Sequence, residues 1–258
     1  MTQGPVLVVG ASGNLGGAVV RALLAKGRRV RAAGTDVNAL EKAFPAAEAV
    51  RLDLHQPTSF GPALDGAAGL FLMRPPAISK VGPTLNALLD VAGQSGVDHV
   101  VFSSVTGADT NRVVPHHRVE RHLHASSLSW TILRPGFFAQ NLADAYAADI
   151  VRCNRIYLPA GHGRAAFVDV RDIGAAATVV LAEPCAHAGK GYALSIVGYA
   201  RHLRRQGMPV PRVLVQTILH TGLRYGQGES LDPALERLLG RPPTSLQQYV
   251  HDHRSTWT

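Results

Sequence analysis

The chain has 258 residues, with 46% hydrophobic and 17% charged side chains, which is the composition of an ordinary globular protein. It contains two cysteines, Cys153 and Cys185, without CxxC spacing, which argues against a disulfide framework and a zinc knuckle. The sequence has neither a membrane-spanning run of roughly 20 apolar residues nor a signal-peptide pattern, so we expect a cytoplasmic protein.

The formal net charge of +8 raises the question of a nucleic-acid partner. The basic residues are 22 arginines and 4 lysines, and they are scattered apart from a mild cluster at Arg201, Arg204, Arg205 and Arg212. The sequence lacks interleaved aromatic residues and a known binding module. We therefore expect neither a nucleic acid nor a membrane as a partner.

The first 140 residues alternate between strand and helix patterns. The continuous apolar run PVLVVG (5–10) is typical of a buried parallel strand, and a helical pattern follows it at 15–27. Further strands are expected at 28–34, 47–54, 68–73, 98–104 and 129–135, and helices at 83–96 and 115–125. This βαβ alternation predicts an α/β fold, a doubly wound parallel sheet with helices on both faces.

The pattern changes after residue 140. A helical pattern covers 137–150, residues 164–182 resemble a strand that enters a helix, and short strand patterns occur at 155–161 and 191–195. The tail from 197 is mostly helical in pattern. We expect a dinucleotide-binding Rossmann domain over 1–140 and a smaller, mostly helical substrate-side region over 141–258, interleaved with it.

The segment GASGNLG (10–16) lies between the first strand and the first helix. Gly10 permits a tight turn, Gly13 lets the backbone approach a pyrophosphate, and Gly16 allows close packing of the helix. The free N–H groups at the start of the helix then face the anion. The loop therefore predicts a site for NAD or NADP. Its other expected contacts come from Ser12, Asn14 and Leu15.

The GxxGxxG spacing is the form found in short-chain dehydrogenases, and six further segments extend the resemblance. They are LDL (52–54), ALDGAAGLFLMRPP (63–76), VFSSVTGAD (101–109), HHRVERHLHASSLSWTILRPGFFAQNL (116–142), FVDVRDIGAAATVVLAEP (167–184) and GRPPTSLQQYVHDH (240–253). In combination they resemble the NmrA-like atypical short-chain dehydrogenases, a group that includes quinone and dye reductases and a redox-sensing regulator.

The resemblance implies cofactor contacts outside the glycine loop. In the family, the aspartate of the LDL segment lies beside the adenine, and the turn at Pro135 and Gly136 meets the nicotinamide amide. The implied contacts are Thr35, Asp53, Leu54, Met73, Arg74, Ser103, Pro135 and Gly136.

The choice between NAD and NADP stays open. Many family members place an arginine just after the second strand, where it meets a 2′-phosphate, and this chain has Thr35 there. Asp36 can accept a hydrogen bond from a ribose hydroxyl, which favours NAD. Arg31 or Arg51 can still reach a phosphate.

Short-chain dehydrogenases carry a serine at the end of the fifth strand and a Tyr-x-x-x-Lys pair on the next helix, with the tyrosine as proton donor. Here the strand ends in Ser103 and Ser104, and His116 and Glu120 occupy the tyrosine and lysine positions. One interpretation is catalytic: His116 donates a proton and Ser104 polarises the substrate oxygen. Glu120 is a poor substitute for the lysine, because it would raise the pKa of the histidine and favour a fixed positive charge over an exchangeable proton. The other is that His116 and Glu120 are only a polar pair beside the cofactor. Tyr146 is a distant substitute for the missing acid.

The remaining histidines of PHHRVERHLHA (115–125) favour no metal site. His122 and His124 lie two residues apart, so they point in different directions from a helix. His117 and His124 can share one face, but no third ligand is evident. We expect most of this cluster to form a solvated helix face.

The expected substrate contacts are Thr106, Phe137, Phe138 and Asn141, although a core role for the two phenylalanines fits the pattern equally well. Compared with the family, the region after residue 195 looks shortened by about one helix and one strand. The pocket is then either more open or rebuilt by residues 197–230.

These observations predict an NAD(P)H-dependent oxidoreductase that reduces a small apolar acceptor, a quinone or an aromatic or polycyclic ketone, by hydride transfer. The alternative is a catalytically silent NAD(P)-sensing regulator that binds a protein partner. The missing Tyr/Lys pair and the shortened region favour that alternative. A homodimer is compatible with both.

Overall fold

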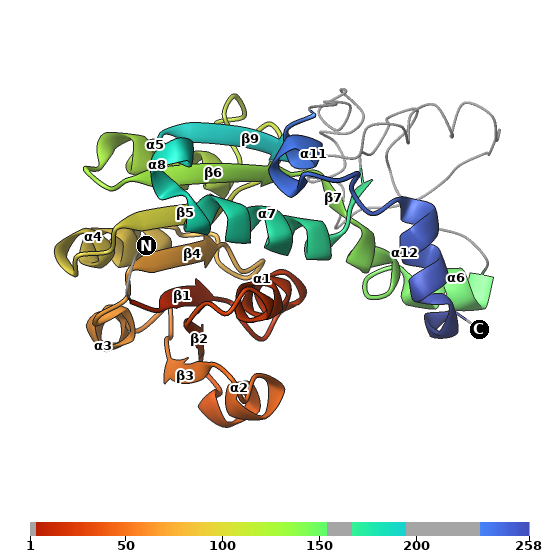
Figure 1. The fold of residues 1–258 in the computed structure, drawn as a ribbon, viewed down its shortest axis with the longest axis horizontal. Helices are drawn as coiled ribbons and strands as arrows, with labels where there is room; N and C mark the ends of the chain where they lie inside the picture. The colour runs from red at the N-terminus through yellow and green to blue at the C-terminus, as the bar shows by residue number, and fades with distance from the viewer. Residues whose placement is uncertain (1–3, 154–166, 195–232, 258) are drawn as a thin grey trace. The chain divides into compact units, whose positions relative to one another are not determined.

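The computed structural model describes residues 4–153, 167–194 and 233–257 (Figure 1). The expectations for the strand at 155–161, the region after 195 and the arginine cluster at 201–212 lie outside these residues. The chain divides into two compact units. The first comprises Met1–Arg134 and Ile173–Tyr192, and the second comprises Pro135–Asp172 and Ala193–Thr258.

The first unit is built around a seven-stranded sheet with the order β3-β2-β1-β4-β5-β6-β9. The strands are β1 Val6–Val9, β2 Val30–Gly34, β3 Glu48–Arg51, β4 Gly69–Met73, β5 His99–Ser103, β6 Trp130–Pro135 and β9 Lys190–Leu194. β1 pairs in parallel with both β2 and β4, and parallel pairing continues to β3 on one side and to β5 and β6 on the other. The predicted doubly wound α/β sheet is confirmed, and its order reverses between β1 and β4.

Helices cover both faces of the sheet, as Figure 1 shows for α7. They are α1 Asn14–Ala25, α2 Val37–Ala43, α3 Phe60–Leu64, α4 Ala87–Gln94, α5 Pro115–Ala125, α7 Val170–Ala182 and α8 Pro184–His187, with the short 3-10 helix η1 Pro57–Ser59. Buried side chains of α3, α4 and α5, such as Leu64, Leu88 and Leu123, form one core cluster with strand residues. Helices α1 and α7 pack closely, because a Cβ on Gly174 would lie 2.8 Å from the carbonyl oxygen of Ala18.

One predicted helix is confirmed but begins with a different kind of helical turn, and another is wrong in part. The segment 83–96 begins as a π-helical turn, η2 Gly82–Asn86, before α4 starts. The segment 137–150 begins as a strand, β7 Phe137–Phe138, which pairs in parallel with β8 Phe167–Val168. Pairing with a strand some thirty residues away overrides the local helical pattern there. The 3-10 helix η3 Ala139–Leu142 and helix α6 Ala147–Cys153 follow.

The second unit has its own small core. It consists of Ala139, Leu142, Tyr146, Phe167 and Tyr249. Tyr249 comes from α12 Leu246–Asp252, which follows α11 Ala234–Leu239 and precedes the 3-10 helix η4 Arg254–Thr256. The C-terminal segment is therefore an integral part of this unit.

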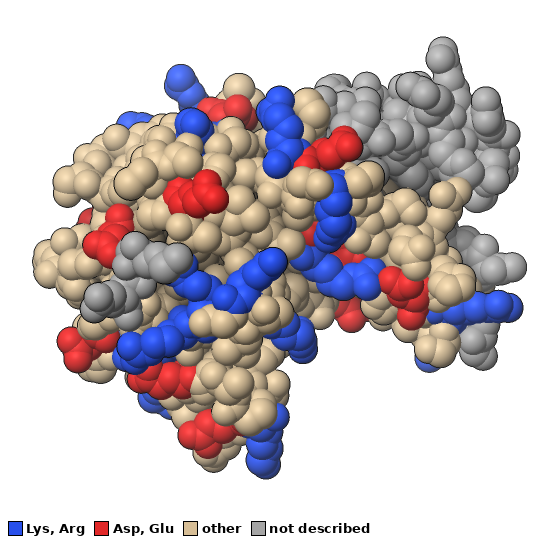
Figure 2. All heavy atoms as spheres, in the orientation of Figure 1, with Lys and Arg blue, Asp and Glu red and all other residues tan. Residues whose placement is uncertain are grey.

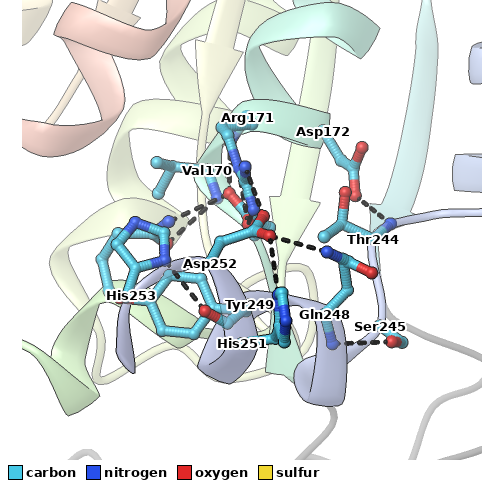
Figure 3. Close-up of polar contacts among 12 residues, drawn as sticks. Val170, Arg171, Asp172, Thr244, Ser245, Gln248, Tyr249, His251, Asp252 and His253 are labelled. Carbon is cyan, nitrogen blue, oxygen red and sulfur yellow. Dashed lines mark hydrogen bonds and ion pairs between the residues drawn. The ribbon is translucent and has the colours of Figure 1, made fainter. Parts of the chain in front are cut away.

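Polar contacts at the start of α7 hold that C-terminal segment in place (Figure 3). The fully buried Asp172 accepts hydrogen bonds from the backbone N–H of Thr244 at 2.6 Å and from Nη2 of Arg241 at 2.7 Å. Arg171 pairs with Asp252 of α12 at 2.9 Å (Figure 3). The start of the segment 167–184 thus binds the segment 240–253, and both segments are among those that carry the family resemblance.

Two global features bear on possible partners. No helix among the described residues is long and apolar enough to cross a membrane. On the face drawn in Figure 2, Lys and Arg side chains of the described residues lie among Asp and Glu side chains.

Candidate functional site

The glycine loop turns at the carboxyl end of β1 and enters α1. Gly10 has a φ of 75°, which favours glycine, and a Cβ there would lie 2.9 Å from Sδ of Met73. A Cβ on Gly16 would overlap the carbonyl oxygen of Gly10, so glycine is required for α1 to pack against the turn. Gly13 is different, because its φ is −89° and a Cβ there would meet its nearest neighbour at 3.4 Å. The protein itself therefore leaves room for a side chain, or a ligand, in front of Gly13.

The first turn of α1 begins directly after the glycine loop. The N–H of Gly17 donates to the carbonyl oxygen of Gly13 at 2.8 Å. The N-terminal end of an α-helix carries partial positive charge on its first N–H groups. Ser12, Gly13 and Asn14 are exposed, whereas the side chain of Leu15 is buried. This arrangement suits an anion, which Leu15 can contact only through its backbone.

The two arginines considered for a 2′-phosphate have different surroundings. Nη1 of Arg31 donates to the carbonyl oxygens of Ala63 and Asp65, and its Nε pairs with Glu48 at 3.0 Å. Arg31 is thus engaged in contacts within the fold. Arg51 is exposed, and its Nη1 donates to the carbonyl oxygen of Thr35 at 3.4 Å.

Two acidic residues near the expected adenosine end have local structural contacts. Asp36 caps α2 by accepting a hydrogen bond from the N–H of Ala39 at 3.0 Å. Asp53 accepts from the N–H of His55 at 2.9 Å and so shapes the turn after β3. Leu54 is buried beside it in the core cluster of the first unit. Each carboxylate retains a second oxygen for a ligand.

His116 lies in the first turn of α5 and is 6% exposed. Its Nε2 accepts a hydrogen bond from Nε of Arg74 at 3.3 Å. Burial, and then the positive charge of Arg74, lower the pKa of His116 to about 3. The expectation that Glu120 raises this pKa is wrong, because the charge that acts on the imidazole is that of an arginine. His116 is therefore neutral near pH 7.

Glu120, one turn further along α5, belongs to a different buried cluster. Its carboxylate accepts hydrogen bonds from Nε and Nη2 of Arg134, at 3.0 and 2.7 Å, and from Oγ of Ser104 at 2.5 Å. The hydroxyl proton of Ser104 is thus directed at Glu120, which leaves it unavailable to polarise a substrate oxygen in this arrangement. Thr106 donates to the carbonyl oxygen of Arg134 at 3.3 Å. Ser103 is buried at the end of β5.

Several expected site residues belong to the second unit. The N–H of Gly136, which follows Pro135, donates to the carbonyl oxygen of Leu194 at 2.9 Å. Phe137 contacts Phe167 and Tyr146, with ring centroids 5.0 and 5.9 Å apart, so it packs against the core of this unit. Phe138 and Asn141 are half-buried. Tyr146 itself is buried, and burial raises its pKa to about 12, which makes it a weak proton donor.

The other histidines of α5 have separate roles. His117 bonds to the carbonyl oxygen of Ala108 at 2.8 Å, and His122 pairs with Asp90 at 2.7 Å. His124 packs against Trp130, with ring centroids 4.5 Å apart. In the described parts of the chain, no group of three or more His, Cys, Asp or Glu side chains is placed to hold a metal ion.

Comparison with known proteins identifies the family to which this sheet and glycine loop belong. The model of the NmrA-like family matches residues 2–200. The chain belongs to the NmrA-like family.

Members of this family with assigned activities are similar to the chain over nearly its whole length. It is 31% identical to the NAD(P)H azoreductase of Xenophilus azovorans, covering 96% of this chain and 90% of that protein. It is 27% identical to quinone oxidoreductase 2 of Escherichia coli (strain K12), covering 95% of this chain and 97% of the relative.

Solved structures show the same fold. The quinone oxidoreductase QOR2 of Escherichia coli, complexed with NADPH, matches with a TM-score of 0.81 and 22% identity over 96% of this chain and 99% of that one. Nmra, a negative transcriptional regulator in complex with NAD, matches with a TM-score of 0.74 and 15% identity over 98% and 96% of the two chains. Both kinds of dinucleotide thus occur on this fold.

Sequence reasoning missed one residue near the site, Arg134, and one contact of a residue that it had named, Arg74. Arg134 pairs with Glu120, and Arg74 binds His116 through its side chain rather than serving only as an expected cofactor contact. A signal for the first pair exists in the sequence: Arg134 ends a buried strand, and Glu120 lies on the apolar side of α5 between Val119 and Leu123. A half-buried arginine and a buried glutamate need partners.

Proposed function

We propose that this chain is an NAD(P)H-dependent oxidoreductase that transfers a hydride to a small apolar acceptor. The observation that carries the proposal is the glycine loop at the switch point of the sheet. The fold leaves no room for a side chain at Gly16, whereas it leaves space in front of Gly13 at the N-terminus of α1. This is the arrangement that a dinucleotide diphosphate requires.

The residues present fit such a cofactor. The loop 10–16 would hold the diphosphate, and Thr35 and Asp53 would border the adenosine. When bound, NAD(P)H supplies the hydride from C4 of its nicotinamide ring. The chain's own contribution is to bind and orient both reactants and to exclude water between them.

The acceptor we propose is a quinone, with an azo compound next, rather than a ketone. Reduction of a quinone consumes one hydride and one proton. Hydride transfer gives a hydroquinone anion, which is stable enough to form without a protein donor, and its phenolate oxygen then takes the proton from water. A ketone needs a proton donor, whereas His116 is neutral and Ser104 donates to Glu120. The quinone oxidoreductase and the azoreductase among the relatives support these two classes of acceptor over a ketone.

A regulatory function is the second candidate. The carboxylate and hydroxyl at the positions expected to be catalytic are bound to one another and to Arg134, an arrangement that needs no substrate. The likeness to Nmra, a transcriptional regulator that binds NAD, supports this alternative.

The test measures binding and turnover side by side. Calorimetric titration of NADH and NADPH gives binding, and the loss of reduced-cofactor absorbance gives turnover with a panel of quinones, azo dyes and aromatic ketones. We expect binding together with quinone turnover. Binding without turnover of any acceptor would favour the regulator, and no binding would contradict both functions.

A further inference from the structure

The hydrogen bond between Arg74 and His116 links two segments 42 residues apart in the sequence. Arg74 follows β4, and His116 lies in the first turn of α5. A guanidinium group has donors and no acceptor, so in this contact the arginine nitrogen is the donor and Nε2 of the imidazole is the acceptor. A neutral imidazole that accepts at Nε2 carries its proton on Nδ1.

We propose that Arg74 is a positioning residue that holds His116 as a neutral imidazole with Nδ1–H as a fixed hydrogen-bond donor to a carbonyl oxygen of the acceptor. This inference rests on the proposed function and names what one residue of that site contributes to binding. His116 then orients and polarises the acceptor without losing its own proton.

Arg74 is itself firmly held. Its Nη1 donates to the carbonyl oxygens of Pro75, Pro76 and Ile78, at 3.0, 3.1 and 2.6 Å. The guanidinium plane is thereby fixed by its own loop, which leaves Nε directed at the imidazole. A fixed cationic donor at Nε2 also polarises the ring, so Nδ1–H becomes a stronger hydrogen-bond donor.

The surroundings of His116 agree with a neutral ring. The charged group that acts on it is Arg74, while Glu120 on the same helix is bound by Arg134 and Ser104. The Phe102 ring of β5 lies with its centroid 6.3 Å from that of the imidazole and adds no charge. The next side chain, His117, bonds to the carbonyl oxygen of Ala108.

Nδ1 of His116 is the atom left for a ligand. It has no hydrogen-bond partner within the described residues, and it is not among the polar atoms there that are both sealed from solvent and unpaired. The tyrosine at this helix position in short-chain dehydrogenases donates to the substrate oxygen. A neutral Nδ1–H donor makes the same hydrogen bond, but it transfers no proton.

Nitrogen NMR of the ¹⁵N-histidine-labelled protein without any acceptor tests the tautomer directly. The His116 signal is assigned by its loss in His116→Gln. We expect Nδ1 to be protonated and Nε2 unprotonated from pH 8 down to about 5. A proton on Nε2, or titration near the ordinary histidine pKa of about 6.5, would overturn the proposal.

Two variants separate Arg74 from a general charge effect. Arg74→Leu removes the hydrogen-bond donor to His116. Arg118→Leu, the control, removes an exposed arginine from α5, the helix that carries His116. We expect Arg74→Leu to raise the His116 pKa, to a value still below 6.5 because burial remains, and to allow both tautomers. Equal spectra for the two variants would contradict the role of Arg74. If Arg74→Leu does not fold, the wild-type tautomer still decides.

Turnover provides the second readout. With a quinone as acceptor, the pH profile of kcat/KM between pH 5 and 8 should show no histidine ionisation in the wild type. In Arg74→Leu the same profile should change at the pKa of a histidine. A histidine ionisation in the wild-type pH profile would contradict the proposal. The NMR measurement needs no turnover. A wrong tautomer therefore appears in the NMR spectrum, whereas a wrong proposed function appears as the absence of turnover.

Discussion

Glu120 accepts two hydrogen bonds from the guanidinium group of Arg134, at 3.0 Å from Nε and 2.7 Å from Nη2, while its side chain is only 2% exposed. Burial disfavours the charge on Arg134, but the hydrogen bond and the charge of Glu120 outweigh it and raise the pKa of the arginine. The pair joins α5 to the end of β6. The glutamate at the family's lysine position therefore stabilises the fold around Ser104.

Removal of Glu120 alone should destabilise the protein strongly, because the half-buried guanidinium group of Arg134 keeps its charge and loses its carboxylate partner. For Glu120→Ala we expect a loss of about 3 kcal/mol in the free energy of unfolding, measured by urea denaturation. The double variant Glu120→Leu with Arg134→Met should recover most of it. The control is Glu41→Ala, which removes an exposed carboxylate. If Glu120→Ala lowers the free energy of unfolding as little as Glu41→Ala does, the pair has no structural role.

Valine at position 13 should block the dinucleotide without disturbing the fold. The backbone of Gly13 is extended, and a Cβ added there would lie 3.4 Å from its nearest neighbour, the carbonyl oxygen of Gly10. The valine side chain would therefore occupy the space that the ligand needs. Calorimetry should detect no NADH or NADPH binding to Gly13→Val, with the thermal midpoint nearly unchanged. Gly16→Val is the contrasting variant, since it overlaps Gly10 and should lower the thermal midpoint. Normal binding by a folded Gly13→Val protein would show that the diphosphate lies elsewhere.

Arg51 should distinguish NADPH from NADH. It lies opposite Gly34 in the β2–β3 register and contacts Thr35, where the ribose is expected. A charge-assisted hydrogen bond to a 2′-phosphate contributes about 1.5–3 kcal/mol, so Arg51→Gln should raise the Kd of NADPH about tenfold or more. The Kd of NADH should stay the same. In the control variant Lys42→Gln, which removes an exposed positive charge of α2, the Kd values of both cofactors should stay the same. A parallel change for both cofactors would exclude a phosphate contact.

Two buried histidines should make the fold sensitive to acid. Burial, and then the charge of His187, lower the pKa of His99 to about 4, and burial and Arg74 lower that of His116 to about 3. Both are neutral when folded but take up protons near pH 6.5 when unfolded. Their contribution is therefore complete above pH 6.5 and is lost as the pH falls from 6.5 toward 4.

Urea unfolding at pH 7.5, 6 and 5 measures this effect. In the fold, His99 bonds to the hydroxyls of Ser129 and Thr131, at 2.8 and 2.9 Å. His99→Gln keeps polar groups there but cannot be protonated, so its stability should depend less on pH. An identical slope for the wild type and this variant would mean that His99 does not titrate differently in the two states.

The parts of the fold that the sequence predicts well are those with a local cause. The run PVLVVG is apolar at every position because β1 is covered on both faces, and the glycine spacing follows from the turn into α1. The segment 137–150 fails for the opposite reason. Its helical pattern is real, but Phe137 and Phe138 pair with Phe167 and Val168, which no local pattern reveals.

The same distinction applies to the candidate site. The resemblance names His116 and Glu120, yet their partners decide what they do. His116 binds an arginine from the β4 end rather than the glutamate on its own helix, and Glu120 binds Arg134. An i, i+4 spacing permits contact between two side chains but does not require it.

The central claim is that this chain transfers a hydride from NAD(P)H to a quinone. A single-turnover experiment with cofactor deuterated at C4 on one face or the other measures that step before product release. We predict that deuterium on one face slows cofactor oxidation and that deuterium on the opposite face does not. Oxidation at the same rate with the undeuterated cofactor and with each of the two deuterated ones would contradict the account. So would the absence of oxidation when both the cofactor and a quinone are bound.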